Sequence, residues 1–336
     1  MDHAGAGEVL EMSLSDYQRK FMRLNVNTSG GRASPHKICM LLAVLDIARA
    51  GSLPTNRIAF GPALLERYER FFAAVRTPRD QLNAFFPYFH LGGNLRGKEA
   101  SFWHLHAIPG RESNLADLKS VHSTSEVTAN IAFASLDDAL FELLQSPVNI
   151  EALAETLARH WFDRGLSDLG IVVRHAGQIS RYERQIRSGA ILVANEPAPP
   201  SVIRDPAFRR VVIEVYKYRC AASGLRVVLR NSEAMVEAAH IHPFSESRDD
   251  DPRNGIALTP DMHWAMDKNL IAPGPDHLWH VSEALDPRIP DFARFVDLRG
   301  RKIMLPDEPR MYPKQEALAW RLEKLRNPEW NADLDV

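Results

Sequence analysis

The segment of residues 235–271, MVEAAHIHPFSESRDDDPRNGIALTPDMHWAMDKNLI, constrains the fold of this chain more than any other. Its pattern predicts a strand that ends in AAHI, a polar loop, the stretch RNGIAL, and a helix that begins near Thr259-Pro260-Asp261. These are the parts of a ββα unit. We therefore expect such a unit in the C-terminal half of the chain.

Three polar side chains in this segment are candidates for chemistry on a phosphodiester. A histidine on a strand can take a proton from water, because neutral imidazole titrates near neutral pH, and His240 has this position. His263, on the predicted helix, is suited to hold a divalent cation against a scissile phosphate. Asn254 precedes a glycine in a turn, where its amide can hold the loop or the base.

Two carboxylates are candidate partners of His263 in a metal site. Asp267 follows His263 by four residues, which places both on one face of the helix. Glu237 points to the face of the strand opposite to His240, where a further ligand can sit. Asp267 could instead accept a bond from a backbone amide, and Glu237 could be structural or act through water.

The distribution of charge indicates more than the net charge of −2. Residues 204–230 contain seven basic and two acidic residues, and Arg209, Arg210 and the loop residue His242 are candidate phosphate contacts. The alternative for the two arginines is a solvated helix face, and the alternative for His242 is an exposed loop entrance.

The chain is expected to have an α+β fold with two domains. Residues 1–12 are predicted to be disordered, 13–165 to form a mainly helical domain with short strands, 166–204 a basic linker region, and 205–336 the ββα domain. The proline-rich NEPAPPS marks the boundary. Helices are predicted at 13–24, 36–51, 61–75, 135–161 with a break at Ser146-Pro147, 205–220, 259 onward and 314–326, and strands at NRIAF, SFWHLHAI, RVVLRN, MVEAAHI and 278–281.

Several classes of protein are excluded by the sequence. The longest apolar run, Ile38 to Ala48, is too short to cross a bilayer and is interrupted by Asp46. The N-terminus lacks the basic start and apolar core of a secretory signal. Cys39 and Cys220 are far apart in separate predicted domains, so we expect no disulfide between them. Together, these features predict a cytoplasmic protein with no membrane contact.

The stretch from Phe208 to about Leu270, with EAAHIHPF, RNGIAL and MHWAMDKNL, resembles the HNH endonucleases, which have a ββα-metal fold. The trailing HVSEAL, LRGRKIMLP and ALAW resemble one branch of these enzymes, the modification-dependent restriction endonucleases. This resemblance implies hydrolysis of double-stranded DNA with a divalent metal, Mg²⁺ or Mn²⁺. HNH enzymes commonly carry an acidic or histidine ligand just before the base, and Ala239 stands there, which leaves the ligand set open.

The N-terminal half is similar to the sulfur-binding domain of endonucleases that recognise phosphorothioated DNA. The similarity rests on GGRASPHKICMLLAVLDIARAG, FFPYFHL and SFWHL. It implies an apolar pocket for the phosphate sulfur at His36, Lys37, Phe86 and Pro87, with Arg32 as a phosphate or base contact. The chain has Lys37-Ile38 where the family has a basic residue and proline, and Phe86 where tyrosine is common. Phe86-Pro87 could instead be a core aromatic before a proline, and His36 a helix cap.

Three functions follow as hypotheses. The first is an endonuclease in which residues 13–165 read a phosphorothioated backbone and residues 205–336 cut by a one-metal mechanism. The second is an HNH nuclease that reads another mark, such as a modified cytosine, with the aromatics of SFWHLHA stacking on a flipped base. The third is a non-catalytic reader of modified DNA. The terminal helix ALAWRLEKL could pair two chains as a homodimer or pack on its own domain.

Overall fold

The computed structural model describes residues 12–162, 169–189, 198–229 and 233–326. The chain divides into two compact units, Met1–Ser180 and Arg181–Val336. The predicted disorder at 1–12 falls, except for Met12, outside the described residues, as do residues 195–197 of the NEPAPPS spacer. Within the predicted basic linker region, residues 169–188 form a long helix, α9.

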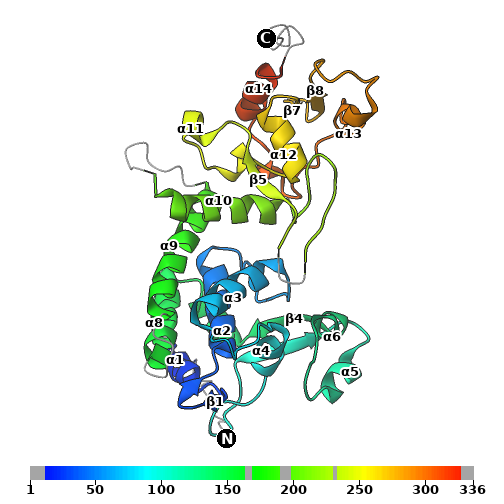
Figure 1. The fold of residues 1–336 in the computed structure, drawn as a ribbon. Helices are drawn as coiled ribbons and strands as arrows, with labels where there is room; N and C mark the ends of the chain where they lie inside the picture. The colour runs from blue at the N-terminus through cyan, green and yellow to red at the C-terminus, as the bar shows by residue number, and fades with distance from the viewer. Residues whose placement is uncertain (1–11, 163–168, 190–197, 230–232, 327–336) are drawn as a thin grey trace, which may run out of the picture. The chain divides into compact units, whose positions relative to one another are not determined.

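The first unit is built around helix α2, which is buried nearly along its whole length. Its residues Ile38–Arg49 are all buried, because HKICMLLAVLDIAR is apolar on almost every face. Figure 1 shows α2 among its neighbours α3, α4 and α8, and α1 packs against α8. The helices of this unit are α1 (Leu14–Met22), α2 (His36–Arg49), α3 (Pro62–Val75), α4 (Phe85–His90), α5 (Glu112–Asp117), α6 (Thr124–Asn130), α7 (Asp138–Leu143), α8 (Pro147–Phe162) and the start of α9 (Leu169–Ser188).

A buried charge cluster holds α2 to two other helices of this unit. Asp46 of α2 has no exposed surface, and its carboxylate lies 2.6 Å from Arg70 and 3.3 Å from Arg67 of α3. Arg49 lies 3.5 Å from the same carboxylate, and Ser180 of α9 donates a hydrogen bond to it. The charge that interrupts the apolar run is therefore neutralised inside the core.

Two small antiparallel sheets complete the first unit. Strands β1 (Thr28–Ser29) and β2 (Arg32–Ala33) pair through a turn in which Gly30 and Gly31 both have positive φ. This backbone is accessible to glycine and matches the twist of a tight hairpin. Strand β3 (Trp103–Ala107) pairs with β4 (Ile131–Leu136), with a bulge between His106 and Ala107.

The second unit places a short hairpin between two helices. Strand β5 (Glu237–His240) pairs antiparallel with β6 (Gly255–Leu258), so that His240 lies opposite Gly255. Helix α10 (Ser201–Val215) packs against both strands, and α12 (Pro260–Asp267) also lies against them (Figure 1). A Cβ on Gly255 would meet Val212 at 2.4 Å, so α10 can approach the hairpin closely only with glycine there.

The remaining elements of the second unit are short. Strands β7 (Ile271–Pro273) and β8 (Trp279–Val281) form a second hairpin, and β7 packs against α14. The others are α11 (Phe244–Ser247), η1 (Pro252–Asn254), η2 (Pro290–Phe292), α13 (Ala293–Val296), η3 (Pro309–Met311) and α14 (Gln315–Glu323).

Most predicted helices are confirmed, and the differences fall on strands and helix starts. NRIAF forms no strand but a single bridge from Ile58 to Ala134, and RVVLRN, where described, contributes only a bridge at Val228. The helix predicted from Ser135 begins later, because residues 131–136 pair with β3, although the predicted break before Pro147 is confirmed. Helix α10 begins at Ser201 and accommodates Pro206 in its first two turns.

The two cysteines and the membrane prediction can also be compared with the structure. Cys39 and Cys220 are both buried free thiols, and burial raises the pKa of Cys39. None of the described helices has both the length and the apolar character needed to span a membrane.

Candidate active site

His240 lies at the end of β5 in a rigid, largely enclosed position. Its ring stacks on Phe208 of α10 at a centroid distance of 3.8 Å and an interplanar angle of 1°. Nε2 lies 2.9 Å from Oδ1 of Asp250, and the side chain keeps 21% of its surface exposed. Arg321 of α14 donates to the His240 carbonyl oxygen at 3.3 Å, which fixes the backbone as well.

Asp250, which the sequence does not single out, is a buried partner of His240. Its side chain is 1% exposed and lies in the loop between α11 and η1. Tyr182 of α9 donates to Oδ2 at 3.0 Å, and Arg204 of α10 donates to Oδ1 at 3.1 Å. Burial raises the pKa of Tyr182, and the negative charge of the Asp250 carboxylate raises it further. The sequence gives no local signal for these contacts.

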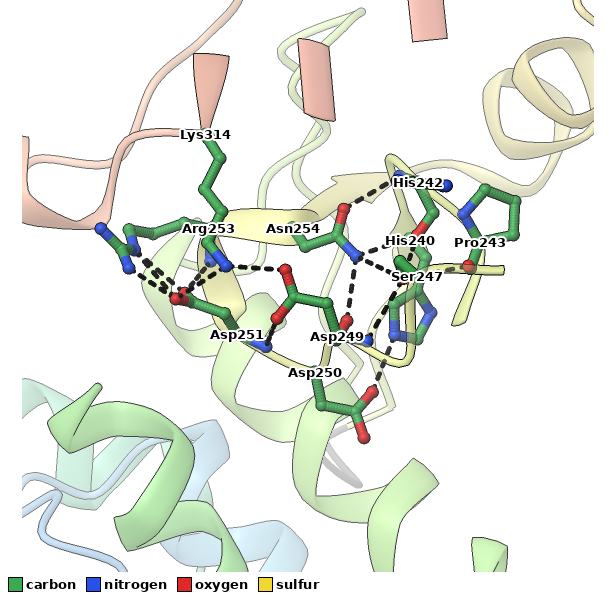
Figure 2. Close-up of polar contacts among 10 residues, drawn as sticks. All are labelled: His240, His242, Pro243, Ser247, Asp249, Asp250, Asp251, Arg253, Asn254 and Lys314. Carbon is green, nitrogen blue, oxygen red and sulfur yellow. Dashed lines mark hydrogen bonds and ion pairs between the residues drawn. The ribbon is translucent and has the colours of Figure 1, made fainter. Parts of the chain in front are cut away.

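Asn254 is the organiser of the loop that follows β5. Figure 2 shows its amide at the centre of the loop: Oδ1 accepts from the His242 amide at 2.9 Å, and Nδ2 donates to the carbonyl oxygens of His242 and Asp249, each at 2.9 Å. The residue has no exposed surface. Its amide therefore holds the loop, and it has no surface with which to contact a substrate.

His263 stands with the two carboxylates that were its predicted partners. Nδ1 of His263 lies 2.8 Å from Oε2 of Glu237, the first residue of β5. Nε2 lies 3.5 Å from Oδ2 of Asp267, one turn further along α12. The side chains are 26%, 52% and 58% exposed for His263, Glu237 and Asp267. The carboxylates flank opposite edges of the ring, so in this arrangement a single ion on one ring nitrogen can share only one of them.

The donor set fits a divalent ion only as an open site. In the parts of the chain that the structure describes, no three or more His, Cys, Asp or Glu side chains are grouped so as to hold a metal ion. Mg²⁺ commonly takes only one or two carboxylates from a protein and fills its other positions with water and substrate phosphate. One nitrogen of His263 and one adjacent carboxylate match that habit.

His240 and His263 lie on opposite faces of β5. Alternation along the strand places His240 on the face toward α10, together with Gly255 of the paired strand. Glu237 and the buried Ala239 point to the other face, toward α12. The strand therefore separates the two histidines: His240 is its last residue, and His263 contacts its first residue, Glu237.

Comparison with known proteins identifies this region. Residues 220–272 match the model of the HNH endonuclease family. The chain contains an HNH domain. No curated protein matches the chain.

One solved structure that resembles the chain is titled "Modification dependent TagI restriction endonuclease", with 18% sequence identity and a TM-score of 0.28. That match covers 42% of this chain and 43% of the other, less than half of either.

The predicted phosphate contacts of the HNH domain differ in their surroundings. Arg209 of α10 is exposed, and His242 is partly exposed, with its ring stacked on Trp320 at 4.1 Å. Arg210 is only 6% exposed, and its Nη1 lies 3.0 Å from the buried carboxylate of Glu183. Because this pair lies inside the domain, we no longer expect Arg210 to contact phosphate.

The four residues of the predicted sulfur pocket line one cavity in the first unit. It has a volume of about 380 Å³ and is lined by Asn25, Val26, Asn27, Ser34, His36, Lys37, Asn83, Phe86, Pro87 and His90. Phe86 is 39% exposed, so it is not the core aromatic of the alternative interpretation. Burial lowers the pKa of Lys37. The pKa of His90 is lowered by its own burial and, to a smaller extent, by the positive charge of Lys37.

His36 and Arg32 are both held by neighbouring groups. His36 is not the cap of α2, since Pro35 has that position; Nδ1 lies 2.9 Å from Ser34 Oγ and Nε2 2.9 Å from the Gln81 carbonyl oxygen. Arg32 lines an adjacent cavity, where its Nη1 lies 2.9 Å from Asp80. Asn27 and Ser34 line both cavities, so the pocket continues toward Arg32.

Proposed function

We propose that this chain is a modification-dependent DNA endonuclease. The HNH domain would hydrolyse phosphodiester bonds of double-stranded DNA, and residues 13–165 would read a phosphorothioate in its backbone. The observation that carries the proposal is the HNH match at 220–272, which contains His240, Asn254 and His263 on the β5, η1 and α12 elements described above.

His240 is the general base of the proposed reaction. It takes a proton from water, and the resulting hydroxide attacks phosphorus in line with the bond to the 3′ oxygen. That bond breaks, and the 3′ oxygen takes a proton from solvent, which leaves 5′-phosphate and 3′-hydroxyl ends. Asn254 keeps the loop after His240 closed, because its amide joins His242 to Asp249.

His263 and one of its two carboxylate neighbours would hold Mg²⁺ or Mn²⁺. When bound, such an ion supplies positive charge that stabilises the pentacovalent phosphorus and the leaving oxygen. Glu237 and Asp267 are alternatives for this role, since they lie at opposite edges of the His263 ring. Both carboxylates are more than half exposed, so either could bind an ion that also contacts a substrate phosphate.

The cavity at Lys37 and Phe86 suits a sulfur-substituted phosphate. Sulfur is larger and less strongly hydrated than oxygen, so the apolar wall of Phe86 and Pro87 favours it, while the Lys37 ammonium compensates the charge. Arg32 and the exposed Arg209 are candidates for further phosphate contacts. One HNH site cuts one strand, so a double-strand break requires two copies of the chain or two binding events.

The proposal is tested with three matched duplexes, one phosphorothioated, one with modified cytosine and one plain, each incubated with the purified protein with and without Mn²⁺. We expect metal-dependent cleavage that is strongest on the phosphorothioated duplex. Cleavage that is indifferent to sulfur would remove the sulfur pocket from the account. Tight binding to the sulfur duplex without cleavage under any metal would instead identify a non-catalytic reader.

A further inference from the structure

The carboxylate of Asp250 is enclosed by three groups that point into it. Tyr182 and Arg204 donate hydrogen bonds to it, and Nε2 of His240 lies 2.9 Å from Oδ1 (Figure 2 shows the contact with His240). The Arg204 guanidinium is held in turn over the Phe244 ring at 3.7 Å. The side chain of Asp250 is 1% exposed, so these groups and not water determine its surroundings.

We propose that Asp250 is the positioning residue of the general base, fixing the His240 tautomer so that Nδ1 is the nitrogen that takes the proton from water. The proposal rests on the proposed nuclease function. It goes beyond that function because it assigns a role to a residue outside the predicted set of His240, Asn254 and His263.

The hydrogen bonds made by Asp250 require the tautomer of His240 that is protonated at Nε2. An ionised carboxylate paired with Arg204 can only accept, so Nε2 of His240 must carry the proton that it donates. A neutral imidazole has one N–H, and Nδ1 is therefore left with its lone pair. The described residues offer Nδ1 no hydrogen-bond partner, and the partly exposed side chain leaves room for water.

The packing of the ring allows no alternative pose without cost. Phe208 covers one face of His240 in parallel contact, and Arg321 holds the backbone carbonyl of His240. A flip of the ring would place a carbon against the buried carboxylate and leave the Asp250 oxygen without its donor. When Nδ1 takes a proton, Asp250 also lies beside the positive charge that forms on the ring, as the third member of a catalytic triad does.

The test is the ring nitrogen spectrum of His240, measured by ¹⁵N NMR on the full chain labelled at histidine, with His240→Gln used to assign the signals. In the wild-type protein at a pH where the ring is neutral, we expect a protonated Nε2 and an unprotonated Nδ1. In Asp250→Asn, Tyr182 holds the amide oxygen at the Oδ2 position, which Arg204 also reaches at 3.3 Å, so the amide NH₂ takes the Oδ1 position facing Nε2 and the proton moves to Nδ1. Cleavage should then fall by about ten-thousandfold, as when a triad histidine is held in the wrong tautomer.

Asp251→Asn is the matched control, because Asp251 lies in the same loop, bonds Arg253 and Lys314, and has no contact with His240. It should leave the His240 spectrum and the cleavage rate unchanged. A wild-type ring protonated at Nδ1, or Asp250→Asn that cuts at the parental rate, would overturn the proposal. If Asp250→Asn does not fold, the wild-type tautomer still decides. The spectrum needs no cleavage, so an inactive wild-type protein would contradict the proposed function alone.

Discussion

His240 and His263 belong to the same HNH match but lie in contrasting surroundings on the two faces of β5. Both nitrogen-bearing edges of His263 face carboxylates that are more than half exposed. His240 has one edge on a buried carboxylate and one ring face on Phe208. The comparison teaches that the residue expected to move a proton is fixed by the fold, whereas the residue expected to hold an ion lies in a site that ion, water and phosphate must complete.

The open site is tested most strongly by removal of its one imidazole. His263→Ala leaves only Glu237 and Asp267 to hold an ion, and we expect cleavage in saturating DNA and moderate Mn²⁺ to fall by about a hundredfold. The loss should be recovered in part by raising the Mn²⁺ concentration, since affinity for the ion is what the variant lacks. A variant that cuts at the parental rate at low Mn²⁺ would remove His263 from the site.

The loop that follows His240, which Asn254 holds, is tested by measuring the stability of the protein. Asn254→Ala removes four hydrogen bonds made by a side chain with no exposed surface, and the His242 amide and the Asp249 carbonyl oxygen lose the partner that it provides. We expect the free energy of unfolding of the HNH domain to fall by about 3 kcal/mol. Urea unfolding followed by tryptophan fluorescence measures this loss. An unfolding midpoint equal to that of the wild type would show that the loop does not depend on the amide.

Comparison of the two carboxylates sharpens the picture of the open site. Glu237→Gln and Asp267→Asn should differ, because one ion on His263 can share only one of them in the observed arrangement. We expect one substitution to weaken Mn²⁺ binding by about tenfold and the other to leave it nearly unchanged, as measured by electron paramagnetic resonance of free Mn²⁺. Equal losses in both variants would mean that the two carboxylates reorganise around a common ion.

The cavity of the first unit offers a smaller, pH-dependent effect. Burial lowers the pKa of Lys37, so its ammonium should lose its proton at a lower pH than an ordinary lysine. Affinity for phosphorothioated DNA should therefore weaken a few-fold as the pH rises into the alkaline range. Lys37→Arg keeps its charge over that range and should bind independently of pH. A parallel decline in Lys37→Arg would assign the pH effect to another group.

The sequence predicted the neighbours of His263 because their signals are local: strand parity and helical spacing placed Glu237 and Asp267 beside it. The resemblance to the sulfur-binding domain implied that residues at the starts of α2 and α4 share a pocket, and these residues line one cavity. Asp250 could not be found this way, because Tyr182 and Arg204 reach it only once α9 and α10 pack against the loop. The burial of Arg210 against Glu183 has the same origin, and a basic residue on a helix gives no sign of it.

The central claim is that His240 is the base of a DNA-cutting HNH site, and chemical rescue tests it most directly. His240→Ala leaves a space beside Phe208 and keeps Asn254 and the His263 cluster unchanged. We predict that this variant binds DNA like the wild type, loses cleavage by about a thousandfold or more, and regains part of it when imidazole is added in the presence of Mn²⁺. Cleavage by His240→Ala at the parental rate would contradict the claim.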